Sequence, residues 1–333
     1  TIKHKNFDVP SVNSSSNPFN VRSQFDTASG EMFKKIHNIF YTILLSLSTF
    51  SIVSAYDDKP FKPPGRFISI GFQTMYVDCL GDNKPTILVD VGIAESSASW
   101  YKIAKELSKD TRICLYDRAG YGWSDPGRGE RTTVTIVHEL KLLLKRAKIS
   151  GPYVLVGHSF GGFTIRYFAA KFPENVIGLV LVDSSHPEQI YRLSALDDGN
   201  KKPLVTGRRA VAPKDFSEFE KKWYFLNSSR KATFAQMAEL KYFKQSAYQV
   251  KHSGPLKDIP IAVLSRGIGQ LPELNGVSLE NEWQDMQKDL LKLSRNSWQL
   301  IVADSGHEIH KEAPNHVVEN ILKVVNKSKN SAK

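Results

Sequence analysis

The sequence is poor in cysteine and lacks the short motifs that mark nucleotide or zinc sites. It has two cysteines in 333 residues, and neither falls in the paired Cys/His spacing of a zinc site. A P-loop, a GxGxxG run and an internal repeat are also absent. These absences argue against a zinc module, the common nucleotide-binding folds and a repeat architecture. They give no reason to expect a metal or an organic cofactor.

What is present is the composition of an ordinary globular protein. Hydrophobic residues make up 41% of the chain and charged residues 24%, which suits one large α/β domain or two small ones. The formal charge of +11 would suit an anionic partner such as a membrane surface, a nucleic acid or an acidic substrate. Basic composition alone is a weak pointer, and we expect no nucleic-acid partner.

The N-terminal region predicts a secretory signal peptide over residues 32–55. Met32 is followed by two lysines, an apolar stretch over residues 39–53 and a small-x-small cleavage pattern that ends at Ala55. A cut after Ala55 would send the protein outside the cell or to a periplasm. A membrane tether is the alternative, but the apolar run is only 15 residues long and is interrupted by serine and threonine. Residues 1–31, rich in serine and asparagine, are expected to be a disordered upstream extension or a misplaced start.

Past Ala55 the sequence alternates strand-like and helix-like segments. Most strand-like runs are continuously apolar, as in strands buried on both faces of a parallel sheet. Helical periodicity appears between them, for example over residues 100–107, 137–144 and 317–324. The pattern predicts an α/β, mostly parallel, doubly wound sheet of eight strands. The predicted strands cover residues 66–72, 74–81, 86–92, 112–117, 153–158, 176–183, 259–265 and 298–304.

One interval breaks this rhythm. About 70 residues separate the sixth and seventh predicted strands, and a loop of that length needs structure of its own. Its sequence reads as short amphipathic helices, so residues 186–258 are expected to form a helical cap on a core made of residues 56–185 and 259–333. Residues 190–258 carry fourteen Lys/Arg and seven Asp/Glu. That charge suits an anionic substrate or weak contact with an anionic membrane surface, and it suits a solvated helical face equally well.

The strand YVLVGH runs directly into the sequence Gly-His-Ser-Phe-Gly-Gly. Residues 157–161 match the GxSxG nucleophile elbow, a strained turn between a strand and a helix that exposes the central serine. Glycines two residues before and after Ser159 are expected because side chains would collide in so tight a turn. Chance matches to GxSxG are common, but the preceding strand and the following helical sequence supply the context that the motif requires.

The chain resembles the α/β-hydrolase superfamily over roughly residues 66–327. The resemblance rests on five segments in the expected order: DVGIAESSASW, YDRAGYGWSDPG, LVGHSFGG, LVLVDSSHPEQ and DSGHEIH. It implies an exported, bacterial-type serine hydrolase with a GHSFG elbow and a helical cap. The family order of nucleophile, acid and base then places the remaining catalytic candidates.

The resemblance implies that His307 is the general base, because the family pattern places it just beyond the last strand; His310 is the alternative. The acid is less clear, because no carboxylate stands at the end of the seventh strand. Asp183, at the end of the sixth strand, is favoured as the residue that fixes the His307 tautomer. Glu273 and Glu280 are the other candidates.

Attack on a carbonyl creates an oxyanion, which requires preorganised donors. The resemblance points to the backbone N–H groups of Ile93 and Phe160, with Val91 where many relatives have histidine. The charged residues of the YDRAGYGWSDPG segment are interpreted as loop scaffolding; they are Asp117, Arg118 and Asp125.

The same resemblance places the second strand beside the fourth, and these strands hold Cys79 and Cys114. An oxidising compartment would permit a disulfide between them. Two free buried thiols are the alternative.

The sequence therefore predicts a serine hydrolase that cleaves a small ester-like substrate through an acyl-enzyme, with a carboxylesterase as the leading activity. Lactonase, thioesterase, lipase and amidase activities stay open. A serine at the elbow argues against haloalkane dehalogenases and epoxide hydrolases, which use aspartate there. The alternative from another class is a ligand-binding or signalling protein of this fold with little turnover.

Overall fold

Eight strands form one sheet in the order β1-β2-β4-β3-β5-β6-β7-β10. The computed structural model describes residues 63–194, 221, 226–227, 229–274 and 276–330. From β4 to β10 all neighbouring strands pair in parallel, whereas β2 runs antiparallel to β1 and to β4. The strands of this sheet are β1 (Arg66–Ser69), β2 (Thr74–Leu80), β3 (Thr86–Asp90), β4 (Arg112–Tyr116), β5 (Tyr153–His158), β6 (Val176–Val182), β7 (Ile261–Arg266) and β10 (Ser297–Val302).

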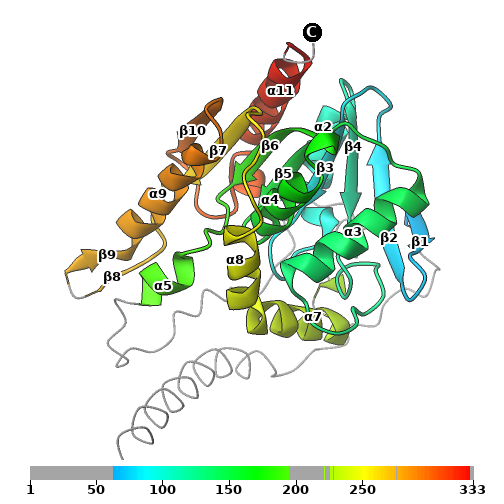
Figure 1. Cartoon of the computed structure of the whole chain (residues 1–333), viewed down its shortest axis with the longest axis horizontal. Coiled ribbons are helices and arrows are strands. Elements are labelled where there is room, and N and C mark those ends of the chain that lie inside the picture. Colours follow the sequence, from blue (N-terminus) through cyan, green and yellow to red (C-terminus); the bar gives the residue numbers. More distant parts are fainter. Residues whose placement is uncertain (1–62, 195–220, 222–225, 228, 275, 331–333) are drawn as a thin grey trace, which may run out of the picture. The chain divides into compact units, whose positions relative to one another are not determined.

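Helices cover both faces of this sheet (Figure 1). One apolar cluster joins α3 and α4 to one face, and another joins α2 and α11 to the other face. Every residue of β3 and β5 is buried, as expected for strands covered on both sides. The core helices are α2 (Tyr101–Leu107), α3 (Thr133–Ala147), α4 (Gly161–Lys171), α9 (Leu279–Asp289), α10 (Ile309–Glu312) and α11 (Pro314–Asn330), with 3₁₀ turns η1 (Ser97–Trp100), η2 (Pro173–Asn175) and η3 (Leu290–Leu293).

The predicted eight-stranded, mostly parallel sheet is confirmed, with differences at its edges. The first strand ends at Ser69 rather than at residue 72, because a turn follows in which Gly71 has a φ of 110°. A two-stranded hairpin, β8 (Glu273–Leu274) and β9 (Val277–Ser278), follows β7. Strands of two residues are too short to give a hydrophobic pattern.

Three described helices lie between β6 and β7, within the segment predicted as a cap. They are α5 (Gln189–Ser194), α7 (Arg230–Lys241) and α8 (Phe243–Lys251). Phe243 of α8 packs against the rings of Phe160 and Phe163 at the start of α4. Residues 195–220, 222–225 and 228 lie outside the described residues, so the cap boundaries stay a prediction.

Helix α7 begins with a conventional cap but buries an unusual residue. The Ser229 hydroxyl oxygen accepts a hydrogen bond from the Ala232 N–H at the start of the helix. The buried face then consists of Ala232, Ala235 and Glu239. A buried carboxylate among alanines requires a polar partner from elsewhere in the fold.

The predicted signal peptide, residues 32–55, and the upstream residues 1–31 lie outside the described part of the chain. Among the residues that the structure does describe, none of the helices has the length and apolarity needed to cross a bilayer.

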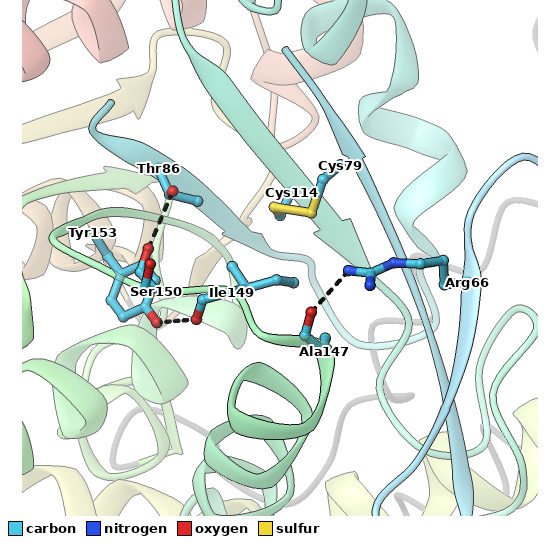
Figure 2. The surroundings of a disulfide bond; sticks show 8 residues. All are labelled: Arg66, Cys79, Thr86, Cys114, Ala147, Ile149, Ser150 and Tyr153. Atoms are coloured by element: carbon cyan, nitrogen blue, oxygen red, sulfur yellow. Dashed lines mark hydrogen bonds between the residues drawn. A yellow bond between two sulfur atoms is a disulfide. The ribbon is translucent and has the colours of Figure 1, made fainter. Parts of the chain in front are cut away.

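A disulfide joins Cys79 of β2 to Cys114 of β4 (Figure 2). The two residues are directly paired in the antiparallel register, and their Cα atoms lie 4.1 Å apart. Close to the bridge, the Arg66 guanidinium donates a hydrogen bond to the Ala147 carbonyl oxygen, which ties β1 to the end of α3 (Figure 2). The cross-link therefore fastens the antiparallel edge strands to the parallel part of the sheet.

Replacing both cysteines by alanine is expected to lower the free energy of unfolding by about 3 kcal/mol, because the bridge restricts the unfolded chain. Urea unfolding of the oxidised wild type and the double variant measures the difference. Wild-type protein treated with reductant is the control and should approach the variant. Equal midpoints for the oxidised wild type and the double variant would contradict the prediction.

Candidate active site

Ser159 occupies the sharp turn between β5 and α4. Its φ is 51°, in the left-handed region that residues other than glycine rarely adopt. Its N–H donates to the Val182 carbonyl oxygen at 3.1 Å, and its carbonyl oxygen accepts from the N–H groups of Gly162 and Ser185. The turn is thus fixed by β6 on one side and α4 on the other, and the serine itself is half-buried.

The glycines around Ser159 are required by close packing. A Cβ atom at Gly157 would lie 2.7 Å from the Gly162 nitrogen, and one at Gly161 would lie 2.2 Å from the Asp90 carbonyl oxygen. Both distances are far below van der Waals contact with backbone atoms that have no freedom to move aside. The steric reason predicted for these two glycines is therefore confirmed.

Asp183 and His307 meet at the carboxyl end of the sheet. Asp183 follows β6, His307 lies in the segment after β10, and the His307 Nδ1 is 2.6 Å from the Asp183 Oδ2. A carboxylate can only accept, so the proton of this hydrogen bond lies on Nδ1 of the histidine. This leaves Nε2 of His307 as the nitrogen available for proton exchange.

Two further residues hold the Asp183 carboxylate. Trp283 of α9 donates its indole N–H to Oδ1 at 2.9 Å, and Arg266 donates through its backbone N–H and its guanidinium. Burial raises the pKa of Asp183, but the hydrogen bond from His307, the electrostatic interactions with His307 and Arg266 and the Trp283 hydrogen bond outweigh it, so the pKa lies below its ordinary value. Asp183 is therefore an ionised, fully buried acceptor.

The two other acidic candidates do not contact His307. Both carboxylate oxygens of Glu280 are engaged by the Arg266 guanidinium and by nearby amides, including the Gln270 N–H. Glu273 is exposed on the short strand β8. Of the three acids considered from the sequence, Asp183 is the one that the structure places against the imidazole.

In the described part of the chain, no hydrogen bond joins the Ser159 hydroxyl to the His307 ring. Nδ1 is the only ring nitrogen of His307 for which this part of the chain supplies a partner. The two residues are nevertheless linked through His158, whose ring centroid lies 4.7 Å from that of His307 and whose Nε2 bonds the His307 carbonyl oxygen. Among the described residues, the His307 Nε2 therefore has no hydrogen-bond partner.

In the loop after β3, the backbone donors on either side of Ile93 are occupied. The Gly92 N–H donates to the Glu95 carboxylate at 2.8 Å, and the Ala94 N–H donates to the Tyr121 hydroxyl at 3.3 Å. Between them, the Ile93 N–H has no hydrogen-bond partner in the part of the chain that the structure describes, and the same holds for the Phe160 N–H. A Cβ atom at Gly92 would lie 3.3 Å from the Ser159 Cβ, so this loop abuts the elbow.

Glu95 links this loop to the two histidine segments. Its Oε2 accepts from Gly92 N–H and lies 2.8 Å from the His158 Nδ1, while its Oε1 lies 3.2 Å from both His310 Nε2 and Lys311 Nζ. Burial raises the pKa of Glu95, but its electrostatic interactions with His158, Lys311 and His310 and the hydrogen bond with His158 hold it well below its ordinary value. Because both ring nitrogens of His158 face acceptors, this cluster ties the elbow to the His307 backbone.

Glu95, His158 and His310 are also the one group of metal-capable side chains found among the described residues, with ligand atoms within 4.8 Å of one another. The ammonium of Lys311 already lies against the Glu95 carboxylate, and His158 uses both ring nitrogens in hydrogen bonds. These contacts supply the positive charge that a metal ion would otherwise bring, so the set fits a charge-balanced support better than a metal centre.

Two other histidines, His310 and His186, occupy structural positions. His310 is buried and stacks on Trp100, with ring centroids 4.7 Å apart and an interplanar angle of 5°. His186 is buried after β6, where its Nδ1 accepts from the Glu188 N–H. Burial and the nearby Arg166 lower the pKa of His186 to about 4, so this imidazole is neutral at pH 7.

The charged residues after β4 support the loops, as the sequence indicated. Asp117 accepts hydrogen bonds from the Ser97 N–H and hydroxyl and from the Trp123 N–H. Asp125 accepts from the Thr74 N–H. Arg118 is buried and bonds the loop after β3.

Sequence reasoning missed the residues that support the site from a distance. Trp283 and Arg266 hold Asp183, Glu95 holds the loop after β3, and Glu239 of α7 pairs with Arg118. Glu95 carries a usable signal, because it lies two residues beyond Ile93 in the DVGIAESS segment. Glu239 gives a weaker one, as an acid on the apolar face of a predicted helix.

The chain belongs to the alpha/beta hydrolase fold family, which matches residues 85–288, more than half of its length. Among related sequences, the uncharacterized protein YqjL of Bacillus subtilis is 29% identical over 247 residues, covering 72% of this chain and 82% of YqjL. An uncharacterized vacuolar membrane protein of Saccharomyces cerevisiae is 30% identical over 283 residues, covering 70% of this chain and 43% of that protein. The chain therefore spans less than half of the yeast relative.

Solved structures share the fold at low sequence identity. Cfl2 from Burkholderia cenocepacia superimposes with a TM-score of 0.59 at 23% identity, covering 78% of this chain and 95% of that protein. A thermophilic esterase from Thermogutta terrifontis gives a TM-score of 0.57 at 20% identity, covering 80% of this chain and 99% of the esterase. At these identities the likeness establishes the fold and leaves the reaction to be argued from the site.

The buried neutral His186 makes stability depend on pH. The unfolded chain binds a proton near pH 6.5, whereas the folded chain resists protonation until about pH 4. Stability is therefore expected to fall by up to about 3 kcal/mol as the pH drops through this window. Replacing His186 by glutamine should flatten the pH dependence of the free energy of unfolding measured in urea.

The exposed His252 offers a matched control. His252→Gln controls for the removal of an exposed histidine, and its slope of stability against pH is compared with that of His186→Gln. An unchanged slope in His186→Gln would show that this histidine is not the group that resists protonation.

Proposed function

We propose that this protein is a serine hydrolase that cleaves an ester-like bond through an acyl-enzyme intermediate, most simply as a carboxylesterase. The observation that carries the proposal is the 2.6 Å hydrogen bond between His307 and Asp183 at the same sheet edge as the strained Ser159 elbow. An acid–histidine pair at the end of the sheet that carries the elbow supports acyl transfer by the serine. Membership of the alpha/beta hydrolase fold family supports the same class.

In the proposed first step, the Ser159 Oγ attacks the carbonyl carbon of the substrate while Nε2 of His307 takes the hydroxyl proton. The π electrons of the carbonyl move to its oxygen, which the N–H groups of Ile93 and Phe160 would stabilise. Collapse of this intermediate breaks the bond to the leaving alkoxide, which receives the proton from His307. Asp183 stabilises the transient imidazolium throughout.

In the second step, water attacks the acyl-serine and gives its proton to His307. The second tetrahedral intermediate expels the Ser159 oxygen, which regains that proton, and the carboxylic acid leaves. These steps use no metal or organic cofactor. A serine at the nucleophile position favours this ester chemistry over the aspartate-based chemistry of haloalkane dehalogenases and epoxide hydrolases.

We also propose that the protein is exported after removal of a signal peptide. The disulfide between Cys79 and Cys114 supports an oxidising compartment, where such bonds form and persist. Weak contact of the basic cap with an anionic membrane surface stays a prediction from charge alone.

Activity-based labelling separates the proposed roles. Ser159→Ala should abolish fluorophosphonate labelling, and Asp183→Asn should lower kcat for short acyl esters by about 10²- to 10⁴-fold because the tautomer of His307 is no longer fixed. A panel of esters graded in acyl length then defines the substrate class. A labelled protein that turns over only once would identify a ligand-binding or signalling role in place of a cycling enzyme.

Glu280→Gln is the matched control for Asp183→Asn, because both carboxylates bond the same Arg266 guanidinium. The Glu280 variant should keep kcat within a few fold of the wild type. A large loss in this variant combined with normal turnover in Asp183→Asn would transfer the role of the acid to Glu280.

Export is tested by the N-terminus of the mature protein. Cleavage after Ala55 should give a chain that starts at Tyr56, seen by intact mass and N-terminal sequencing of protein secreted from an expressing cell. Retention of residues 39–53 in a membrane fraction would identify the tethered form instead.

A further inference from the structure

Arg118 holds the loop that would form half of the oxyanion hole. Its guanidinium donates to the carbonyl oxygens of Val91 and Gly92, the latter at 2.8 Å, and to the carboxylate of Asp90. The side chain is only 1% exposed, so these bonds form away from solvent. Three consecutive residues at the end of β3 therefore share one cation.

The bond to Gly92 fixes the direction of the next amide. In a trans peptide the C=O and N–H of one unit point in opposite directions. The Gly92 carbonyl oxygen faces Arg118, so the Ile93 N–H in the same unit points away from the guanidinium. This is the N–H that has no partner among the described residues, and Gly92 itself packs against Ser159.

Arg118 also contacts the other half of the proposed oxyanion hole and the cap. Its Cζ lies 5.6 Å from the centroid of the Phe160 ring. Its Nε and Nη2 donate to the two carboxylate oxygens of Glu239 on α7, at 2.9 and 3.0 Å. Glu239 additionally accepts from the Tyr121 hydroxyl, which in turn accepts from the Ala94 N–H.

We infer that Arg118, held by Glu239 of the cap, is a positioning residue that aims the Ile93 N–H into the oxyanion hole. This inference rests on the proposed serine hydrolase function. It means that the cap takes part in building the catalytic site as well as in covering it. Lysine cannot replace the arginine, because an ammonium lacks the fork that reaches two carbonyl oxygens and two carboxylates together.

The test compares Arg118→Lys and Glu239→Gln with the wild type in kcat, KM and the inhibition constant of a trifluoromethyl ketone. This ketone forms an oxyanion with an active serine, whereas the corresponding methyl ketone stays a neutral ground-state ligand. Arg118→Lys should lower kcat and weaken the trifluoromethyl ketone by about 10- to 100-fold, part of the effect of losing an oxyanion donor. KM and methyl ketone binding should change by less than about threefold.

Glu239→Gln keeps the shape of the side chain and is the milder variant, for use where Arg118→Lys fails to fold. It should lower kcat and trifluoromethyl ketone affinity in the same direction and to a smaller extent. Unchanged kcat and unchanged trifluoromethyl ketone affinity in both variants would overturn the inference.

Arg131→Lys is the matched control. Arg131 and Glu139 form a second buried pair with a 2.6 Å contact and both side chains 2% exposed, and Arg131 makes no hydrogen bond to the loop after β3. Its replacement should cost stability but leave kcat and trifluoromethyl ketone affinity within about twofold of the wild type. An equal catalytic loss in Arg131→Lys would mean that Arg118 acts through general stability alone.

Amide hydrogen exchange of the peptide that contains residues 91–95 tests whether Arg118 holds this loop, and it requires no measurement of enzymatic activity. Exchange there should rise in Arg118→Lys and Glu239→Gln while exchange of β5 and β6 stays as in the wild type. A wild type that neither reacts with the fluorophosphonate nor turns over esters would refute the proposed function. Unchanged exchange of the loop in both variants would refute the role of Arg118 in holding it.

Discussion

The hydrogen bond between Asp183 and His307 is the contact on which the arrangement of the site depends. It joins positions 124 residues apart, across the intervening strand β7, at the edge where the parallel strands end. Asp183 is fully buried, so a lost partner would leave a charge in a low-dielectric surrounding. Trp283 of α9 and Arg266 of β7 also donate hydrogen bonds to this carboxylate, so both elements help to fix its position.

Much of the fold and the central triad candidates could be predicted from sequence because their signals are local. Buried parallel strands appear as continuous apolar runs, and the elbow is a five-residue pattern in which the glycines are sterically required. Asp183 directly follows β6 and His307 lies five residues beyond the end of β10, so the carboxyl ends of the parallel strands bring them together. The sequence left three candidates for the catalytic acid, because spacing alone does not indicate where a carboxylate points.

The supporting residues could not be predicted in this way, because their partners are remote. Glu239 bonds a residue 121 positions earlier, and Trp283 bonds one 100 positions earlier. Helical periodicity indicates only that such a side chain faces inward, and an inward carboxylate is ambiguous until the opposing cation is known. The disulfide could be predicted only in part. The fold resemblance placed its two strands side by side, but the register that pairs Cys79 with Cys114 is seen only in the structure.

The salt bridge between Glu239 and Arg118 bears on attempts to change substrate preference by exchanging the insertion between β6 and β7. A chimera with a different cap would lack Glu239. The buried guanidinium of Arg118 would then keep only one of its two carboxylate partners, Asp90. Removing one member of a buried ion pair typically costs about 3–5 kcal/mol. Grafting a different cap onto this scaffold therefore requires an acceptor retained at the position of Glu239.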